Sequence, residues 1–166
     1  MTMATLSTLL LALTLMVYAN AEVGVYQEII EINARLDRLE RHVFFMATTS
    51  LTTLPSGALV FGEIRANTGG AYNPATGVFT APVAGLYLFT VQTYIRVSGR
   101  AKLELRVNGS WILRAKTGYG DDESNQFVYP LYLNSGDKVN VENTYPPFTI
   151  WAEHHTFFSG LLFRAL

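Results

Sequence analysis

The sequence contains no cysteine, which removes disulfides, thiolate metal ligands and cysteine nucleophiles from the possible chemistry. It holds only three histidines, of which His154 and His155 are adjacent. On a strand, adjacent side chains point to opposite faces, so this spacing does not predict a metal site. The sequence also lacks a Gly-x-Ser-x-Gly elbow and a phosphate-binding loop. We therefore expect a protein that is not an enzyme.

An excess of charge is missing as well. The chain has 12 basic and 13 acidic residues and a formal net charge of −1, so nothing in its overall charge predicts a nucleic-acid partner. Collagen-like Gly-X-Y repeats are absent. What is present is apolar: 49% of the 166 residues are hydrophobic and 13% are aromatic, which is enough for one domain with a substantial core and some additional chain.

The first 21 residues resemble a targeting segment. Leu6 to Val17 is an apolar run of the length found in secretory signals, and Ala19-Asn20-Ala21 fits a cleavage site. The run is short for a membrane span, which needs about 20 apolar residues. No lysine or arginine precedes it, which is unusual for a signal peptide. We expect residues 1–21 to be a cleaved signal peptide of a secreted protein without a membrane span; the alternative is an uncleaved anchor or a buried helix.

Residues 22–47 have the pattern of a coiled-coil helix. Their apolar residues follow one another in alternating steps of four and three, and are Val25, Ile29, Ile32, Leu36, Leu39, Val43 and Met46. A period of 3.5 residues predicts an a/d seam, in which Arg35 at g and Glu40 at the following e can pair between helices. Ile29 at a and Ile32 at d favour three or four helices over two. The alternative is one amphipathic helix on the surface of the chain's own domain.

The remainder reads as β-structure after a polar linker at residues 48–57. From residue 58 to 166 we expect about ten antiparallel strands. Between Phe61 and Phe89, glycine and asparagine supply tight turns, and Tyr87, Phe89 and Val91 share one face of a strand. Asn108-Gly109 predicts a hairpin turn, and Pro130 predicts an edge strand or a bulge. The fold class is therefore all-β with an aromatic core, preceded by a helix.

The spacing of particular residues resembles the C1q-like globular-head domain of the C1q and tumour-necrosis-factor superfamily. The first set of positions is Phe61, Asn67, Tyr72, Phe79, Gly85, Tyr87 and Phe89, with Val91 where the family has a further aromatic residue. Later motifs in the same order are Leu131-x-Leu133-x-x-Gly136-Asp137 and Thr156-Phe157-x-Ser159-Gly160-x-Leu162. The resemblance covers about residues 57–166 and implies a jelly-roll sandwich that assembles as a homotrimer.

The resemblance also implies recognition as the function. Short members of this family without collagen act as secreted pattern-recognition lectins of innate immunity, in which trimerisation turns weak binding of microbial glycans into avidity. A second possibility is a signalling ligand similar to cerebellins, which binds a protein receptor, although those relatives carry cysteines that this chain lacks. A third is an extracellular matrix component.

Candidate sites follow from the polar and aromatic loops. Asp121, Asp122 and Glu123 offer oxygen ligands for calcium, the only cofactor we consider, and relatives hold calcium in a similar loop; a solvated acidic turn is the alternative. Candidates for glycan contact are Arg100, Lys102, Tyr119, Tyr145, Trp151, Glu153, His154 and His155. Tyr145 and Trp151 could equally pack in the core or between subunits. Asn108-Gly109-Ser110 is an N-glycosylation sequon.

Overall fold

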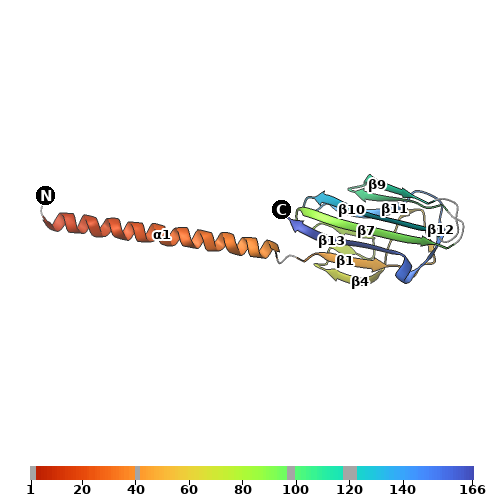
Figure 1. Cartoon of the computed structure of the whole chain (residues 1–166), viewed down its shortest axis with the longest axis horizontal. Helices are drawn as coiled ribbons and strands as arrows, with labels where there is room; N and C mark the ends of the chain where they lie inside the picture. Colours follow the sequence, from red (N-terminus) through yellow and green to blue (C-terminus); the bar gives the residue numbers. More distant parts are fainter. Residues whose placement is uncertain (1–2, 40–41, 97–99, 118–122) are drawn as a thin grey trace. The chain divides into compact units, whose positions relative to one another are not determined.

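A computed structural model describes residues 3–39, 42–96, 100–117 and 123–166. The chain divides into two compact units, residues 1–41 and residues 42–166. The first unit contains helix α1 (Met3–Leu39), and the second contains strands and one short 3-10 helix (Figure 1). The all-β class predicted from the sequence is confirmed for the second unit.

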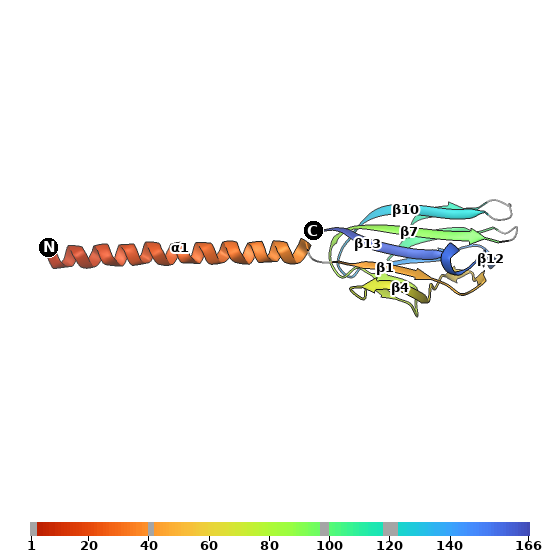
Figure 2. The ribbon, with the colours of Figure 1, turned by 60° about the horizontal axis from the view of Figure 1, so that its bottom comes forward.

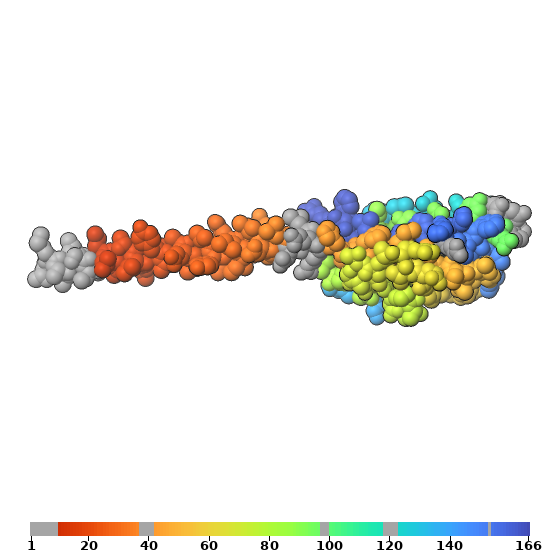
Figure 3. Space-filling view, turned by 90° about the horizontal axis from the view of Figure 1, so that it is seen from below, coloured from red at the N-terminus to blue at the C-terminus, as the bar shows by residue number. Residues whose placement is uncertain are grey.

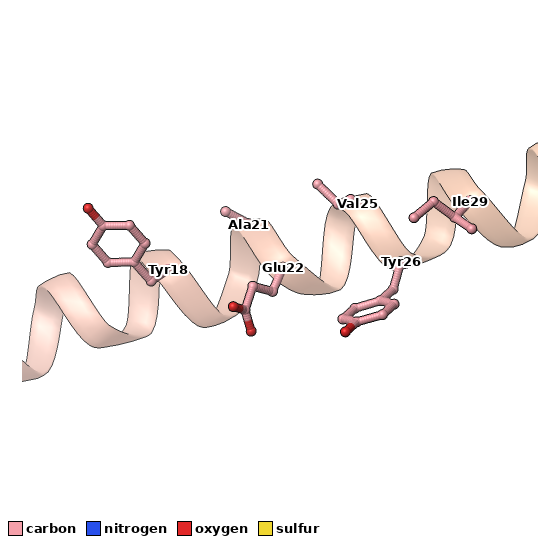
Figure 4. A pocket seen from close by; sticks show the side chains of 6 residues that line it. All are labelled: Tyr18, Ala21, Glu22, Val25, Tyr26 and Ile29. Atoms are coloured by element: carbon pink, nitrogen blue, oxygen red, sulfur yellow. The ribbon is translucent and has the colours of Figure 1, made fainter.

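Helix α1 exposes the apolar residues of the predicted heptad. Val25, Ile29, Ile32 and Leu36 are each about half exposed, and Val25 and Ile29 lie on the same side of the helix (Figure 4). They border an open groove lined by Tyr18, Ala21, Glu22, Val25, Tyr26 and Ile29. Arg35 pairs within the helix, with its guanidinium 2.6 Å from the carboxylate of Glu31. Within residues 3–39, α1 has no segment apolar and long enough to cross a membrane.

The end of the predicted coiled coil is wrong. The helix ends at Leu39, and Phe44–Thr48 forms strand β1, so Val43 and Met46 do not belong to a helical seam. Val43 is buried in the core of the second unit instead. From Val43 into β1, residues 43, 45 and 47 point inward, so Met46 of the predicted seam lies on the opposite face of the strand. The predicted linker at 48–57 is also wrong, because it contains the end of β1, strand β2 and the start of β3.

The second unit is a sandwich of two antiparallel sheets (Figures 1 and 2). The seven-stranded sheet has the order β2-β12-β7-β13-β1-β4, with β10 also paired to β7. Its strands are β1, β2 (Thr53–Leu54), β4 (Glu63–Thr68), β7 (Gly85–Ile95), β10 (Ser124–Leu133), β12 (Phe148–Trp151) and β13 (Phe157–Ala165). Figure 3 shows β4, in yellow, at the surface.

The six-stranded sheet has the order β5-β6-β11-β8-β9, with β3 paired to β11. Its strands are β3 (Gly57–Ala58), β5 (Tyr72–Asn73), β6 (Val78–Thr80), β8 (Lys102–Val107), β9 (Ser110–Lys116) and β11 (Lys138–Asn143). The 3-10 helix η1 (Glu153–His155) precedes β13. The described residues form thirteen strands, more than the ten expected, because several are only two residues long.

Aromatic rings fill the space between the sheets. Phe45 stacks on Tyr72 with ring centroids 4.5 Å apart and meets Phe158 edge-on at 4.9 Å. The Tyr72 hydroxyl donates a hydrogen bond to the Phe61 carbonyl at 3.1 Å and accepts one from the Phe61 amide at 3.3 Å. Burial raises the pKa of Tyr72 to about 12, against the opposing effect of the bond from the Phe61 amide. The Tyr and Phe residues of the spaced motif are therefore core residues.

Two motif positions are explained by close packing and backbone geometry. At Gly160 a Cβ atom would lie 2.6 Å from the Phe45 ring and 2.7 Å from the Phe89 ring, so only glycine fits. In the β8–β9 hairpin, Asn108 and Gly109 have φ of 50° and 81°, the left-handed conformation of a type I′ turn. The hairpin predicted from Asn108-Gly109 is confirmed, and Pro130 lies on β10, whose only strand partner in the described residues is β7.

Candidate ligand-binding and assembly surfaces

The outer surface of the seven-stranded sheet is apolar. Strand register places Phe44, Leu161, Leu88 and Pro130 in one row across β1, β13, β7 and β10. The next row contains Met46, Ser159, Thr90 and Val128. We call the apolar face the set Phe44, Met46, Leu86, Leu88, Val128, Pro130, Tyr132 and Leu161. Val128 is 55% exposed and Tyr132 is 69% exposed, so no other part of the described second unit covers this face.

A cluster of rings and one cation lies where β12 ends beside β7. The guanidinium of Arg96 lies 4.8 Å from the ring centroid of Trp151, and the His155 ring lies 6.3 Å from the same ring. His155 also lies 5.9 Å from Tyr94, and its carbonyl accepts a hydrogen bond from the Gln92 side chain at 3.1 Å. Of the predicted glycan contacts, Trp151 and His155 are thus brought together, at the surface.

A second cluster lies on the outer surface of the six-stranded sheet and is centred on Glu104. This side chain is only 1% exposed although it points away from the core. Its carboxylate accepts hydrogen bonds from Arg106 Nη2 at 2.6 Å and from Arg114 Nε at 2.7 Å. Burial by itself disfavours the charged form of Glu104, but the two arginines outweigh it, so the pKa lies below its ordinary value. The cluster is therefore an ionised carboxylate that fixes two guanidinium groups.

The Glu104 cluster makes stability depend on pH. Because the pKa of Glu104 is lower in the folded state, its contribution is present at neutral pH and is lost as the pH falls below the ordinary pKa of a glutamate and through the lowered one. We expect Glu104→Gln to lower the free energy of unfolding at pH 7 by about 1–3 kcal/mol, and the difference from wild type to shrink on acidification. Urea unfolding at several pH values measures this. The matched control is Glu142→Gln, at a more exposed carboxylate; parallel curves for wild type and Glu104→Gln would contradict the argument.

Lys102 and Tyr145 adjoin the Glu104 cluster. The ammonium groups of Lys102 and Lys116 each lie 6.0 Å from the Tyr145 ring centroid. The loop that carries Tyr145 is held by the buried side chain of Asn143, which accepts a hydrogen bond from the Tyr145 amide at 3.0 Å and donates to the Tyr145 and Pro146 carbonyls. Two of the predicted glycan contacts therefore belong to a surface different from that of Trp151 and His155.

The other predicted contacts are scattered or lie outside the described residues. Arg100 and His154 are exposed, and Glu153 lies in η1. Tyr119, Asp121 and Asp122 lie outside the described residues. Glu123 is described, and its carbonyl accepts a hydrogen bond from the Ile95 amide at 2.8 Å. Among the residues that the structure describes, no group of three acidic, histidine or cysteine side chains could hold a metal ion.

The sequon residue Asn108 is exposed and has a structural role. Its Nδ2 donates to Asp137 Oδ1 at 2.9 Å, and its Oδ1 accepts from the Lys138 amide at 2.9 Å. The hydrogen bonds from Asn108 and from the Asn134 amide lower the pKa of Asp137. A glycan on Nδ2 would leave one N–H on that atom for the bond to Asp137, so the sequon stays a prediction.

Sequence reasoning missed Trp111, Arg106, Arg114 and Arg96 as surface groups of interest. A signal for three of them was available, because counting back from the Asn108-Gly109 turn pairs the polar face of β8 with alternate residues of β9. That count already places Arg106 opposite Trp111; the bulge between Leu105 and Arg106 then shifts the register by one residue and brings Glu104 opposite Arg114. No sequence pattern marks Arg96, whose partner Trp151 is 55 residues away along the chain.

Two antiparallel sheets with an aromatic core between them and one uncovered apolar face define a jelly roll of the C1q and tumour-necrosis-factor type. The family model for the C1q domain matches residues 43–163. The chain belongs to the C1q domain family, since this match covers most of its length, and the resemblance stated from the spaced motif is confirmed.

Individual relatives agree with this assignment. Protein HP-25 homolog 1 of Bos taurus is 36% identical over 90 residues, which cover 54% of this chain and 42% of that protein. Human complement C1q and tumor necrosis factor-related protein 9A is 31% identical over 110 residues, which cover 64% of this chain and 32% of that protein. The chain thus spans less than half the length of these two relatives.

Solved structures show the same fold at low identity. The globular domain of zebrafish complement 1qA protein has a TM-score of 0.64 and 21% identity, covering 76% of this chain and all of that one. The Eiger TNF of S. frugiperda has a TM-score of 0.60 and 16% identity, covering 75% of this chain and 93% of that one.

Proposed function

We propose that this protein is a secreted homotrimeric recognition protein that binds microbial glycans and has no enzymatic activity. The observation that carries the assembly is the uncovered apolar face of a C1q-family domain. Its two central rows contain no charged residue, which is typical of surfaces that are buried in permanent assemblies. Domains of this family often form trimers, and a trimer buries this face in three equivalent interfaces.

The helix supports the same assembly. Between residue 22 and the end of α1 at Leu39, the seam contains Val25, Ile29, Ile32, Leu36 and Leu39, about two and a half heptads. A helix segment this short is marginal on its own in water. We therefore propose a short coiled coil after removal of residues 1–21, which aligns the chains while the β-domain supplies most of the association energy.

Deletion of residues 22–41 is expected to leave the trimer intact. The β-domain keeps the whole apolar face, and the deleted segment contributes only its short seam. Light scattering of the proteins that begin at residue 22 and at residue 42 measures this. A protein that is monomeric without the helix would show that the coiled coil holds the assembly, and a monomer in both cases would contradict the trimer.

Exposed pairs of aromatic rings and cations favour glycan recognition over the other ligand classes. Arg96 with Trp151 and Arg114 with Trp111 each combine a flat apolar ring with hydrogen-bond donors, which suits sugar rings that carry hydroxyl or anionic groups. Three copies in one trimer then multiply weak binding. Binding of the full chain to bacterial polysaccharide that free saccharide competes away is the supporting result. Saturable binding to a host surface protein would instead identify a receptor ligand.

Calcium at Asp121, Asp122 and Glu123 stays a prediction, and an acidic turn without a metal is the alternative. Carboxylate oxygens are suitable calcium ligands. Calorimetric titration tests the site: heat of binding and a higher melting temperature are expected with calcium, and the absence of both would remove it.

A further inference from the structure

Cationic groups outnumber carboxylates on the outer surface of the six-stranded sheet. Register pairs Lys102 with Lys116 and Arg106 with Trp111 across strands β8 and β9. We call this surface the basic outer face and define it as Lys102, Arg106, Trp111, Arg114, Lys116 and Tyr145. Three of its four cations, Lys102, Arg106 and Arg114, pair with two carboxylates, Glu104 and Glu142, in a chain whose formal net charge is −1. The local excess of positive charge is thus a feature of this face and not of the chain.

Arg114 is the cation that the cluster presents to solvent. Arg106 is fully used, because it bonds to Glu104, to Glu142 at 3.0 Å and to the Gly109 carbonyl at 3.0 Å. Arg114 uses Nε for Glu104, and its guanidinium lies 3.8 Å from the ring centroid of Trp111. Its two terminal amino groups have no other partner in the described part of the chain. Because Glu104 and the Trp111 ring hold this guanidinium in place, its terminal amino groups are preorganised to bind a carboxylate or sulfate in a bidentate manner.

Aromatic surface lies beside each group of cations. Trp111 is 54% exposed next to Arg114, and Tyr145 lies between Lys102 and Lys116. Arg114 and Lys116 are alternate residues on one face of β9, about 7 Å apart. The irregularity in the β8–β9 pairing leaves Trp111, opposite Arg106, on the same face, so the three side chains form a line rather than a point. The grooves lined by Tyr18 to Ile29 and by Leu10 to Tyr18 both lie on α1, whereas this line of side chains runs along an exposed strand. A long polymer with repeated charge fits a flat line of this kind.

We propose that the basic outer face binds an acidic polysaccharide, a chain of sugars that bear carboxylate or sulfate groups. The anionic groups bind Arg114, Lys116 and Lys102, and one sugar ring lies on the exposed face of Trp111. This inference rests on the proposed function, because a trimer formed through the apolar face leaves the opposite sheet of each copy open to solvent. Three such faces give the polymer several points of attachment.

The test measures binding of dextran sulfate and of unsulfated dextran to the full chain by calorimetry, at low and at physiological salt. We expect dextran sulfate alone to bind, with affinity that falls as salt rises. Lys116→Gln and Arg114→Gln should each weaken binding about tenfold, and Trp111→Ala should weaken it severalfold without changing the salt dependence. Lys116→Gln keeps the contacts of Glu104, so its result stands even if Arg114→Gln fails to fold.

The matched control is Lys138→Gln, which removes one exposed positive charge from the same sheet outside the basic outer face. It should change the affinity less than twofold. Equal losses in Lys138→Gln and Lys116→Gln, unchanged binding in Lys116→Gln and Trp111→Ala, or tighter binding of single-stranded nucleic acid would overturn the proposal. If dextran sulfate binds but none of these variants changes its affinity, the basic outer face is excluded as the binding site and the proposed function still stands. A trimer that binds no polysaccharide of any charge removes the proposed function itself.

Discussion

Val128→Glu is expected to convert the trimer into single chains. Val128 lies on β10 in the second row of the apolar face, 55% exposed in the single chain, so a carboxylate there is solvated in the monomer. In a trimer the same carboxylate is buried without a partner, once in each of three interfaces, and an unpaired buried charge costs several kcal/mol. The association constant should fall by at least about a hundredfold. Light scattering over a range of protein concentrations measures the mass.

The matched control for this variant is Thr80→Glu. Thr80 is an exposed β-branched residue at the end of β6 on the six-stranded sheet, so the new charge is the same but lies outside the apolar face. We expect Thr80→Glu to remain a trimer and both variants to keep the circular dichroism of a β-sandwich. A trimeric Val128→Glu would mean that copies associate through another surface. Avidity would then require a different arrangement of the copies.

The β-domain could be predicted from sequence because its signals are local or have period two. Tyr87, Phe89 and Val91 alternate with outward residues on β7, and the Asn108-Gly109 turn fixes the β8–β9 hairpin. The spaced motif added the jelly roll, since its Tyr and Phe residues turn out to be core rings and Gly160 is where those rings leave no room for a side chain. The turn, the core rings and the close packing at Gly160 each require a particular residue type at a particular position, so they can be recognised in the sequence.

The start of the domain and the surfaces could not be predicted in the same way. Val43 and Met46 continue a heptad, but the strand puts them on opposite faces, with Val43 in the core and Met46 on the apolar face. Only the pairing of β1 with β13 and β4 reveals the strand. Glu104 reads as an exposed strand residue, yet Arg106 and Arg114 cover it. Arg96 and Trp151 meet only through tertiary structure. Contacts between residues that are far apart along the chain produce no periodic pattern in the sequence.

The core variant with the largest expected effect on stability is Phe158→Ala. Phe158 is fully buried on β13, and its ring meets four others, with centroids 4.9 Å from Phe45, 5.9 Å from Phe61 and Tyr72, and 6.0 Å from Phe89. Its removal leaves a cavity that rings anchored on both sheets cannot fill by moving, and such substitutions cost about 3–5 kcal/mol. Urea unfolding at one fixed protein concentration measures the loss, because assembly makes stability depend on concentration.

Phe158→Leu separates the cavity from the ring contacts. Leucine keeps much of the buried volume but loses the edge-to-face contact with Phe45, and such aromatic pairs contribute about 0.5–1.5 kcal/mol beyond their buried area. We expect this variant to lie between wild type and Phe158→Ala and to remain trimeric. If Phe158→Ala cost less than about 1 kcal/mol, the two sheets would have to be able to close over the cavity. The rigid aromatic core could then not be what holds the apolar face and the basic outer face on opposite sides of the domain.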